Sequence, residues 1–209
     1  MPEPSADTVH IVDDAVEVLR STALLLQTAG YKVATYGSGQ ALLDALPGAA
    51  PGCVLTDVRM PGLSGLELQE RLAAARPDLP VIVVTGHGDI AMAVRAMRAG
   101  AVHFIEKPLA KDVLIAAVED ALRHARRMAD QADEAAEAGR RAQLLTARER
   151  EVMTLLVDGN SNKEIANRLG ISPRTVEGHR AMVLGKMQTR HLADLVRMAL
   201  AVERAGKSG

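Results

Sequence analysis

The stretch Cys53-Val54-Leu55-Thr56-Asp57-Val58-Arg59-Met60-Pro61-Gly62 places an apolar run directly before an acid and a Pro-Gly turn. A short apolar run of this kind is typical of a strand buried on both faces, as in parallel sheets. Cys53, at its head, is expected to be a small core residue. Asp57 follows the run, at the edge where open α/β sheets bind their ligands.

Four similar runs flank this stretch, and helical patterns lie between them. The expected strands are 9–12, 32–36, 54–56, 81–84 and 102–105, and the expected helices lie near 15–29, 38–46, 65–75, 89–99 and from 111 onward. This alternation predicts an α/β fold, a doubly wound five-stranded parallel sheet with helices on both faces. We expect this domain to occupy residues 1–122.

Residues 123–143 are interpreted as a helical linker that extends the fifth helix. Small apolar residues recur at a helical spacing from the end of the first domain into this segment, namely at Leu122, Ala125, Ala129, Ala132 and Ala136. Two interpretations stay open: a solvated spacer, or a weak coiled-coil seam between two copies of the chain. Alanine buries little area and Gly139 interrupts the pattern, so neither interpretation is favoured.

Residues 144–209 predict a small all-α domain of four helices, at 147–158, 162–169, 173–188 and 192–204. Capping boxes mark two of the starts, Thr146 with Glu149 and Ser161 with Glu164, and Ser172 followed by Pro173 marks the third. Gly170 can end the second helix in a left-handed conformation. Two helices joined by such a tight turn indicate a helix-turn-helix.

The charge of the chain is unevenly distributed. Residues 1–141 contain 14 Lys and Arg against 19 Asp and Glu, a net charge of −5, whereas residues 142–209 contain 11 against 7, a net charge of +4. Such a division suggests that only the second part meets a polyanion. With two Tyr, one Phe and no Trp, the chain lacks an aromatic platform for stacking single-stranded bases.

Cysteine content and hydropathy exclude further classes of protein. One cysteine allows neither an intramolecular disulfide nor a cysteine-rich zinc site. No apolar stretch reaches the ~18 residues of a membrane span, and the N-terminus has no apolar signal region. We therefore expect a cytoplasmic protein with no membrane partner.

Charged and hydroxyl side chains follow four of the predicted strands. Asp13 and Asp14 follow the first, Asp57 the third, Thr85 the fourth and Lys107 the fifth. Three clustered carboxylates need a neutralising cation, and Mg²⁺ accepts oxygen ligands while retaining waters. A carboxylate can attack phosphorus to form an acyl phosphate, and the lysine and the hydroxyl can stabilise the developing charge.

Residues 8–122 resemble a response-regulator receiver domain. The motifs that carry the resemblance are Asp13-Asp14, Asp57-Val58-Arg59-Met60-Pro61-Gly62, Thr85-Gly86-His87-Gly88 and Lys107-Pro108. The resemblance implies that Asp57 is phosphorylated, that Asp14 with Asp13 binds Mg²⁺, and that a main-chain carbonyl near Arg59 completes the ligands. It also implies a switch made of Thr85, Phe104 and Lys107, and a cis bond before Pro108.

An enzyme with similar residues is a competing interpretation. Phosphatases of the haloacid-dehalogenase type also use an aspartate nucleophile, but they need an acid two residues later. Arg59 occupies that position and cannot act as the general acid. We therefore expect no enzyme, and at most Mg²⁺-dependent autophosphorylation and autodephosphorylation of Asp57.

The predicted third helix of the C-terminal domain has one apolar face and one face suited to DNA. Val176, Val183 and Met187 share the apolar face. Short or polar groups on the other face suit entry into the major groove. The candidate DNA-binding residues are Lys163, Arg174, Thr175, Glu177, Gly178, His179, Arg180, Ala181 and Lys186.

The C-terminal domain resembles the LuxR-type helix-turn-helix, and the chain as a whole resembles the FixJ-type response regulators. The strings that carry this resemblance include Leu145-Thr146, Asn162-Lys163, Ile171-Ser172-Pro173-Arg174-Thr175-Val176-Glu177 and Lys186-Met187. The resemblance implies a transcriptional regulator of a two-component system, with a sensor histidine kinase, promoter DNA and RNA polymerase as partners.

Phosphorylation is expected to act through a two-state switch that draws Thr85 inward and frees room for Phe104. It would alter dimerisation, interdomain contacts or both, and so DNA binding, with a homodimer forming on phosphorylation. The alternative is a regulator that binds DNA without phosphorylation and uses the first domain only to dimerise. The complete acidic set disfavours that alternative.

Overall fold

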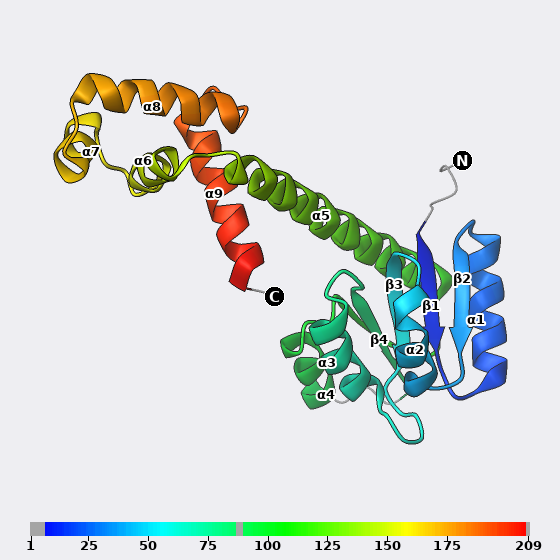
Figure 1. Ribbon diagram of the computed structural model, residues 1–209. Coiled ribbons are helices and arrows are strands. Elements are labelled where there is room, and N and C mark those ends of the chain that lie inside the picture. Colours follow the sequence, from blue (N-terminus) through cyan, green and yellow to red (C-terminus); the bar gives the residue numbers. More distant parts are fainter. Residues whose placement is uncertain (1–6, 87–89, 208–209) are drawn as a thin grey trace. The chain divides into compact units, whose positions relative to one another are not determined.

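The computed structural model describes residues 7–86 and 90–207, and the chain divides into two compact units, residues 1–128 and 129–209 (Figure 1). Residues 87–89, which include His87 and Gly88, lie outside the described residues. None of the described helices combines the length and the apolar character that crossing a bilayer requires.

The N-terminal unit contains a five-stranded parallel sheet with the strand order β2-β1-β3-β4-β5. Its strands are β1 (Thr8–Val12), β2 (Lys32–Tyr36), β3 (Gly52–Asp57), β4 (Val81–Thr85) and β5 (His103–Glu106). The predicted α/β fold class is therefore confirmed. The observed ends of four strands differ from the predicted runs by one or two residues, and those of β2 coincide with its run.

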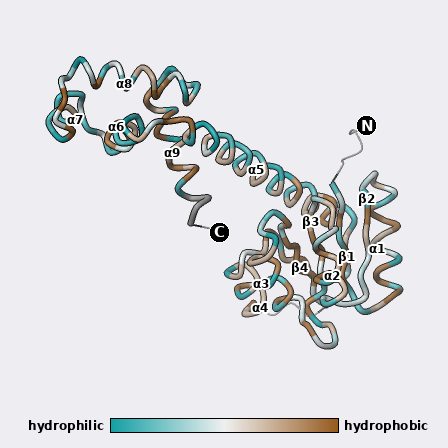
Figure 2. The backbone as a smooth tube through the Cα atoms, viewed as in Figure 1, coloured by the Kyte–Doolittle hydropathy of each residue, from teal (hydrophilic) through white to brown (hydrophobic). Residues whose placement is uncertain are grey.

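Helices cover both faces of this sheet (Figure 1). They are α1 (Val16–Thr28), α2 (Gly39–Ala45), α3 (Gly65–Ala75), α4 (Ile90–Arg98) and α5 (Lys111–Gln143), with a short 3₁₀ helix, η1 (Leu46–Gly48), after α2. One core cluster joins α1 and α5 to the sheet, and a second joins α2, α3 and α4 to its other face. Figure 2 shows the hydrophobic residues gathered in the strands between these layers.

Cys53 lies inside the first of these clusters and is fully buried. Burial raises the pKa of its thiol to about 12, with a further contribution from Asp7. The expectation of a small core residue is confirmed, since a thiol of this kind is almost entirely protonated at neutral pH.

Helix α5 continues without interruption from the N-terminal unit through the predicted linker. The two units meet at Met128, which lies inside the 123–143 segment. Ala125 is buried, whereas Ala129, Ala132 and Ala136 are exposed. Ala135 and Ala138, which are not part of the predicted stripe, are buried in the second unit.

The C-terminal unit contains four further helices, α6 (Ala147–Val157), α7 (Asn162–Leu169), α8 (Pro173–Lys186) and α9 (Leu192–Lys207). The predicted capping boxes are present at Thr146 and Ser161, and Ser172 caps α8. Gly170 has a φ of 65° and ends α7 in the left-handed conformation. The helices share a core that includes Ile165, Val176, Val183, Met187 and Leu195.

Candidate functional site

The carboxyl ends of four adjacent strands bring the predicted acidic site together. β1 pairs with β3, β3 with β4, and β4 with β5, so the residues that end these strands lie along one edge. In the registers, Asp57 lies opposite Val84, and Thr85 lies opposite Glu106. Asp13 and Lys107 each follow the end of their own strand by one residue.

Lys107 joins two of the acids. Its Nζ lies 2.6 Å from Asp57 Oδ1 and 2.9 Å from Asp13 Oδ2. Both carboxylates are nearly buried, with side chains 10% and 6% exposed, and the lysine side chain is 27% exposed. The peptide bond between Lys107 and Pro108 is cis, as the resemblance implied. The Lys107 ammonium therefore pairs with two carboxylates that are largely shielded from solvent.

Backbone amides hold the remaining oxygens of these two acids. The Ala15 N–H donates to Asp13 Oδ1 at 2.9 Å, and the Arg59 N–H donates to Asp57 Oδ2 at 2.7 Å. Hydrogen bonds from backbone amides fix the orientation of a carboxylate. The Arg59 N–H and the Lys107 ammonium thus fix the orientation of the Asp57 carboxylate at the end of β3.

The pKa of Lys107 reflects a balance of opposing effects. Its partial burial lowers the pKa, but hydrogen bonds to Asp57 and Asp13 outweigh that effect and raise it above its ordinary value. The lysine is therefore a positive charge at every physiological pH. A permanent charge at this position can pair with an anionic group attached to Asp57.

The other predicted residues of this site have different surroundings. Asp14 is exposed, and within the described residues its carboxylate has no hydrogen-bond or ion-pair partner. Thr85 is 1% exposed, and its hydroxyl contacts the Met92 sulfur at 4.0 Å. Phe104 is half-buried and packs against the core between the sheet and α2, α3 and α4.

Gly65 and Thr56 belong to the surroundings of Asp57 but were not predicted. The Thr56 hydroxyl donates to the Asp57 carbonyl oxygen at 3.1 Å. A Cβ at position 65 would lie 2.1 Å from that same oxygen, so only glycine allows α3 to begin so close to β3. The capping box of Ser64 and Glu67 marks the start of α3 in the sequence, but it does not reveal this approach.

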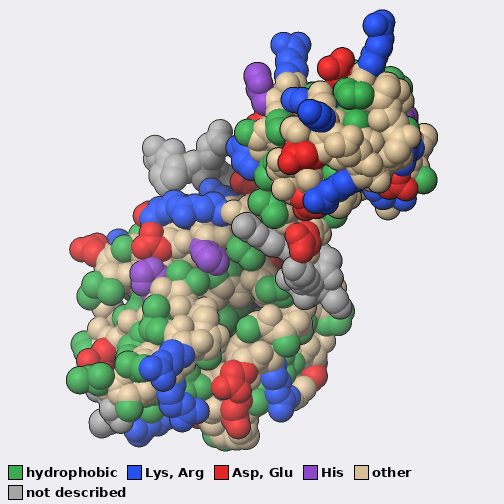
Figure 3. Space-filling view, turned by 90° about the vertical axis from the view of Figure 1, so that its left-hand side faces the viewer, with side chains coloured by type: hydrophobic (Ala, Val, Ile, Leu, Met, Phe, Trp, Pro, Cys, Tyr) green, Lys and Arg blue, Asp and Glu red, His purple; other side chains and the backbone are tan. Residues whose placement is uncertain are grey.

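The exposed side of α8 contains most of the residues predicted to meet DNA. Arg174, Thr175, Glu177, Gly178 and Ala181 are exposed on α8, as is Lys163 on α7. His179 and Arg180 are half-buried. Val176 and Val183 are fully buried on the opposite face of α8, so the helix presents the predicted side to solvent. Figure 3 shows Lys and Arg side chains standing out from the surface of the C-terminal unit.

Lys186, the last of the predicted DNA contacts, pairs with a buried acid. Its Nζ lies 2.6 Å from Glu149 Oε2, and that oxygen also accepts the Thr146 N–H at 2.7 Å. The hydrogen bonds from Lys186 and Thr146 lower the pKa of Glu149 to about 2. This pair, which the sequence did not reveal, ties the start of α6 to the end of α8.

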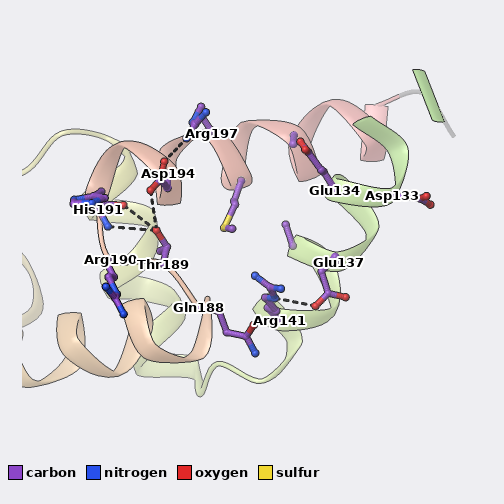
Figure 4. A pocket seen from close by; sticks show the side chains of 13 residues that line it. Asp133, Glu134, Glu137, Arg141, Gln188, Thr189, Arg190, His191, Asp194 and Arg197 are labelled. Atoms are coloured by element: carbon purple, nitrogen blue, oxygen red, sulfur yellow. Dashed lines mark hydrogen bonds and ion pairs between the residues drawn. The ribbon is translucent and has the colours of Figure 1, made fainter. Parts of the chain in front are cut away.

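A cleft of about 740 Å³ lies in the C-terminal unit between the last turns of α5, the connection from α8 to α9 and the first turns of α9 (Figure 4). Its charged walls are paired within their own helices, Glu137 with Arg141 at 2.8 Å and Asp194 with Arg197. Arg141 also donates to the Met187 carbonyl oxygen at 3.2 Å, where α8 ends. The end of α5 therefore supplies a cation to the carboxyl end of α8, where a helix favours positive charge.

Both units match known protein families. Residues 9–119 match the response regulator receiver domain, and residues 143–199 match the luxR family of bacterial regulatory proteins.

Relatives and solved structures extend over nearly the full chain. The transcriptional regulatory protein FixJ of Bradyrhizobium diazoefficiens is 46% identical over 198 residues, with 95% of each chain covered. FixJ of Rhizobium meliloti is 48% identical over 194 residues, covering 93% of this chain and 95% of that one. The low-resolution structure of the response regulator StyR has a TM-score of 0.73 at 37% identity, with 93% and 98% covered.

Full-length FixJ from B. japonicum is 44% identical, with a TM-score of 0.58, and covers 96% of this chain and 98% of its own. These matches agree with the order of the two domains and with the strand and helix pattern of the fold. The chain therefore belongs to the FixJ-type response regulators of two-component systems, and it is a transcriptional regulator with a receiver domain and a LuxR-type DNA-binding domain rather than a classical enzyme.

Proposed function

We propose that Asp57 is the phosphoacceptor of this regulator and that a sensor histidine kinase is its phosphodonor. The observation that carries the proposal is the shared lysine, since Lys107 lies within 2.9 Å of both Asp57 and Asp13. An oxygen of Asp57 attacks phosphorus and forms an acyl phosphate, while the bond between phosphorus and the donor breaks and its electron pair leaves with the donor. Lys107 then pairs with the phosphoryl oxygens.

The residues around Asp57 fit a magnesium ion. Asp13, Asp14 and Asp57 offer carboxylate oxygens, and the carbonyl of Arg59, whose N–H donates to Asp57 Oδ2, is the proposed main-chain ligand. No preassembled group of three His, Cys, Asp or Glu ligands occurs in the described part of the chain. Mg²⁺ prefers oxygen ligands and keeps several waters, so these residues need to supply only part of its coordination shell. When bound, Mg²⁺ supplies charge that offsets the phosphoryl oxygens.

Labelling with a small phosphodonor tests this assignment. We expect the full-length protein with acetyl phosphate and Mg²⁺ to gain one phosphoryl group that hydroxylamine removes. Asp57→Asn should gain none, and chelation of Mg²⁺ should prevent labelling of the wild type. Asp44→Asn, which removes an exposed carboxylate on α2, is the matched control and should label normally. Equal labelling of Asp57→Asn would place the phosphoacceptor elsewhere and contradict the proposal.

The phosphoryl group is proposed to act through Thr85, Phe104 and Lys107. A buried hydroxyl at the end of β4 can turn toward the new anion, and the half-buried Phe104 on neighbouring β5 can then repack. We infer that this change favours a homodimer. Sedimentation of the protein with and without acetyl phosphate tests it, and an unchanged mass over the micromolar range would contradict it.

We propose that residues 144–209 form the DNA-binding domain and that α8 enters the major groove. Residues 1–122 then form the receiver domain, and residues 123–143 link the two domains. The basic charge and the exposed face of α8 support this assignment. We expect Arg180→Ala to weaken binding to all duplexes alike, as loss of a phosphate contact does. Glu177→Ala should instead change which bases are preferred.

Binding measured against salt and sequence separates these effects. Affinity should fall steeply as salt rises, because phosphate contacts release counterions. If both variants lowered affinity uniformly and left base preference intact, the groove-facing side of α8 would be assigned wrongly. Contact with RNA polymerase is proposed on family grounds, and transcription reconstituted from purified components tests it.

A further inference from the structure

Met182 is a large apolar side chain on the solvent side of α8. It is 53% exposed, although a methionine of a core-packed helix is usually buried. On the core-facing side of the same helix, Val176, Val183 and the C-cap residue Met187 are no more than 1% exposed and supply the packing of α8. Met182 therefore adds little to the core, and its apolar surface is available to a partner.

The neighbours of Met182 along the helix leave it room to move. Gly178 lies four residues before it and Gly185 three residues after it, so all three share one side of α8. Apart from the neighbouring backbone of α8 itself, no atom lies within 4 Å of the place where a Cβ would stand at either glycine. A helical side chain leans toward the preceding turn, so the Met182 thioether can cover the gap beside Gly178.

We propose that Met182 is a specificity-determining residue that contacts the 5-methyl group of a thymine in the major groove. The proposal rests on the assignment of α8 as the recognition helix. Thymine is the base that presents a methyl group in that groove, and an apolar side chain recognises it by contact. The flexible thioether of methionine adapts its shape to such a group.

The surrounding side chains favour this apolar contact over a polar one. Gly178, Ala181 and Gly185 offer no hydrogen-bonding side chain on this part of α8, so polar base contacts fall to Arg174, Thr175 and Glu177 nearer its start. Three small residues let the helix backbone approach the bases closely, and Met182 is then the side chain long enough to fill the space between. The contact of Met182 would favour thymine over a base that lacks the 5-methyl group, because it buries that methyl group.

Replacement of thymine by deoxyuridine isolates this contact, because it removes the methyl group and leaves the hydrogen-bonding edge unchanged. We would select duplexes from a random library with the phosphorylated full-length protein, and then replace each thymine of the selected site singly. The wild type should lose about fourfold in affinity at one thymine of each half-site. Met182→Ala should lose this discrimination, and Met182→Leu should retain most of it.

A matched control and three distinct outcomes make the test decisive. Leu144→Ala removes an exposed leucine outside α8 and should discriminate as the wild type does. If Met182→Ala kept the full fourfold preference, or weakened binding to thymine and deoxyuridine duplexes equally, the role of Met182 would be refuted while DNA binding stood. If the wild type selected no duplex at all, the proposed function of α8 itself would fail, and this inference with it.

Discussion

Each unit of the chain contains a lysine whose ammonium lies 2.6 Å from a carboxylate oxygen, but the two pairs have different charge balances. In the receiver unit Lys107 serves both Asp57 and Asp13, which leaves an excess of negative charge at the sheet edge. In the C-terminal unit Lys186 serves Glu149 alone, and a backbone amide completes the pair. The cluster around Lys107 has an excess of negative charge and can bind a further cation. The Lys186–Glu149 pair has equal positive and negative charge and only joins α6 to α8.

Removal of the Lys107 side chain should have the largest effect on stability, because it increases the excess of negative charge at the sheet edge. Lys107→Ala leaves two nearly buried carboxylates without a cation, and we expect a loss of about 3 kcal/mol in the free energy of unfolding. Mg²⁺ should restore more stability to this variant than to the wild type, since a cation that binds the folded state stabilises it. Urea unfolding with and without Mg²⁺ measures both effects, and equal stabilisation of the two proteins would contradict the idea of a shared cation site.

The Lys186–Glu149 pair should instead make the stability of the protein depend on acidic pH. The folded pKa of Glu149, about 2, lies below its ordinary value of 4.5, so the folded state binds fewer protons between these values. Its contribution to stability is complete above pH 4.5 and is lost as the pH falls toward 2. We expect Glu149→Gln to flatten the fall in urea midpoint over this range. Glu177→Gln, on the exposed side of α8, serves as the control, and an identical fall in both variants would refute the role of Glu149.

Two glycines, one in each unit, extend the comparison. Gly65→Ala forces a Cβ against the Asp57 carbonyl, and we expect a loss of about 1–2 kcal/mol in stability together with slower labelling by acetyl phosphate. Gly178→Ala meets no atom and should instead gain up to about 1 kcal/mol, because alanine is the better helix former. Chemical unfolding of the two variants checks both signs, and a stabilising Gly65→Ala would show that α3 can retreat from β3.

The smallest expected effect concerns Arg141, which joins the end of α5 to the end of α8. Arg141→Ala removes its hydrogen bond to the Met187 carbonyl and should cost about 1 kcal/mol in stability. DNA affinity should fall modestly for all duplexes alike. Arg141→Lys keeps the cation and should recover part of both losses, whereas Arg140→Ala, on the more exposed neighbour, should change neither. A shift in base preference would contradict a purely positioning role.

The fold and the helix-turn-helix could be predicted because their signals are local. Apolar runs marked each strand within two residues, and the caps at Thr146, Ser161 and Ser172 marked the starts of three helices. The sequence predicted five parallel strands, and the order β2-β1-β3-β4-β5 came from the structure.

The contacts between side chains could not be predicted in the same way. Lys107 and Asp13 are 94 residues apart, and strand ends alone do not show that one ammonium bridges two acids. Adjacent Asp13 and Asp14 share a motif, yet one is buried and the other exposed, because the backbone turns at the end of β1. Glu149 was recognised as a helix cap, but its pairing with Lys186 depends on how α6 and α8 pack.

The burial of Cys53 decides how the chain can be labelled for spectroscopy. With a thiol pKa of about 12 and no exposed surface, this cysteine should not react with maleimides at neutral pH. A fluorophore can then be attached through Val113→Cys in the first unit or Leu144→Cys in the second without replacing the native residue. Each substitution provides a single reactive thiol at an exposed position, so the response of either unit to phosphorylation or DNA can be followed separately.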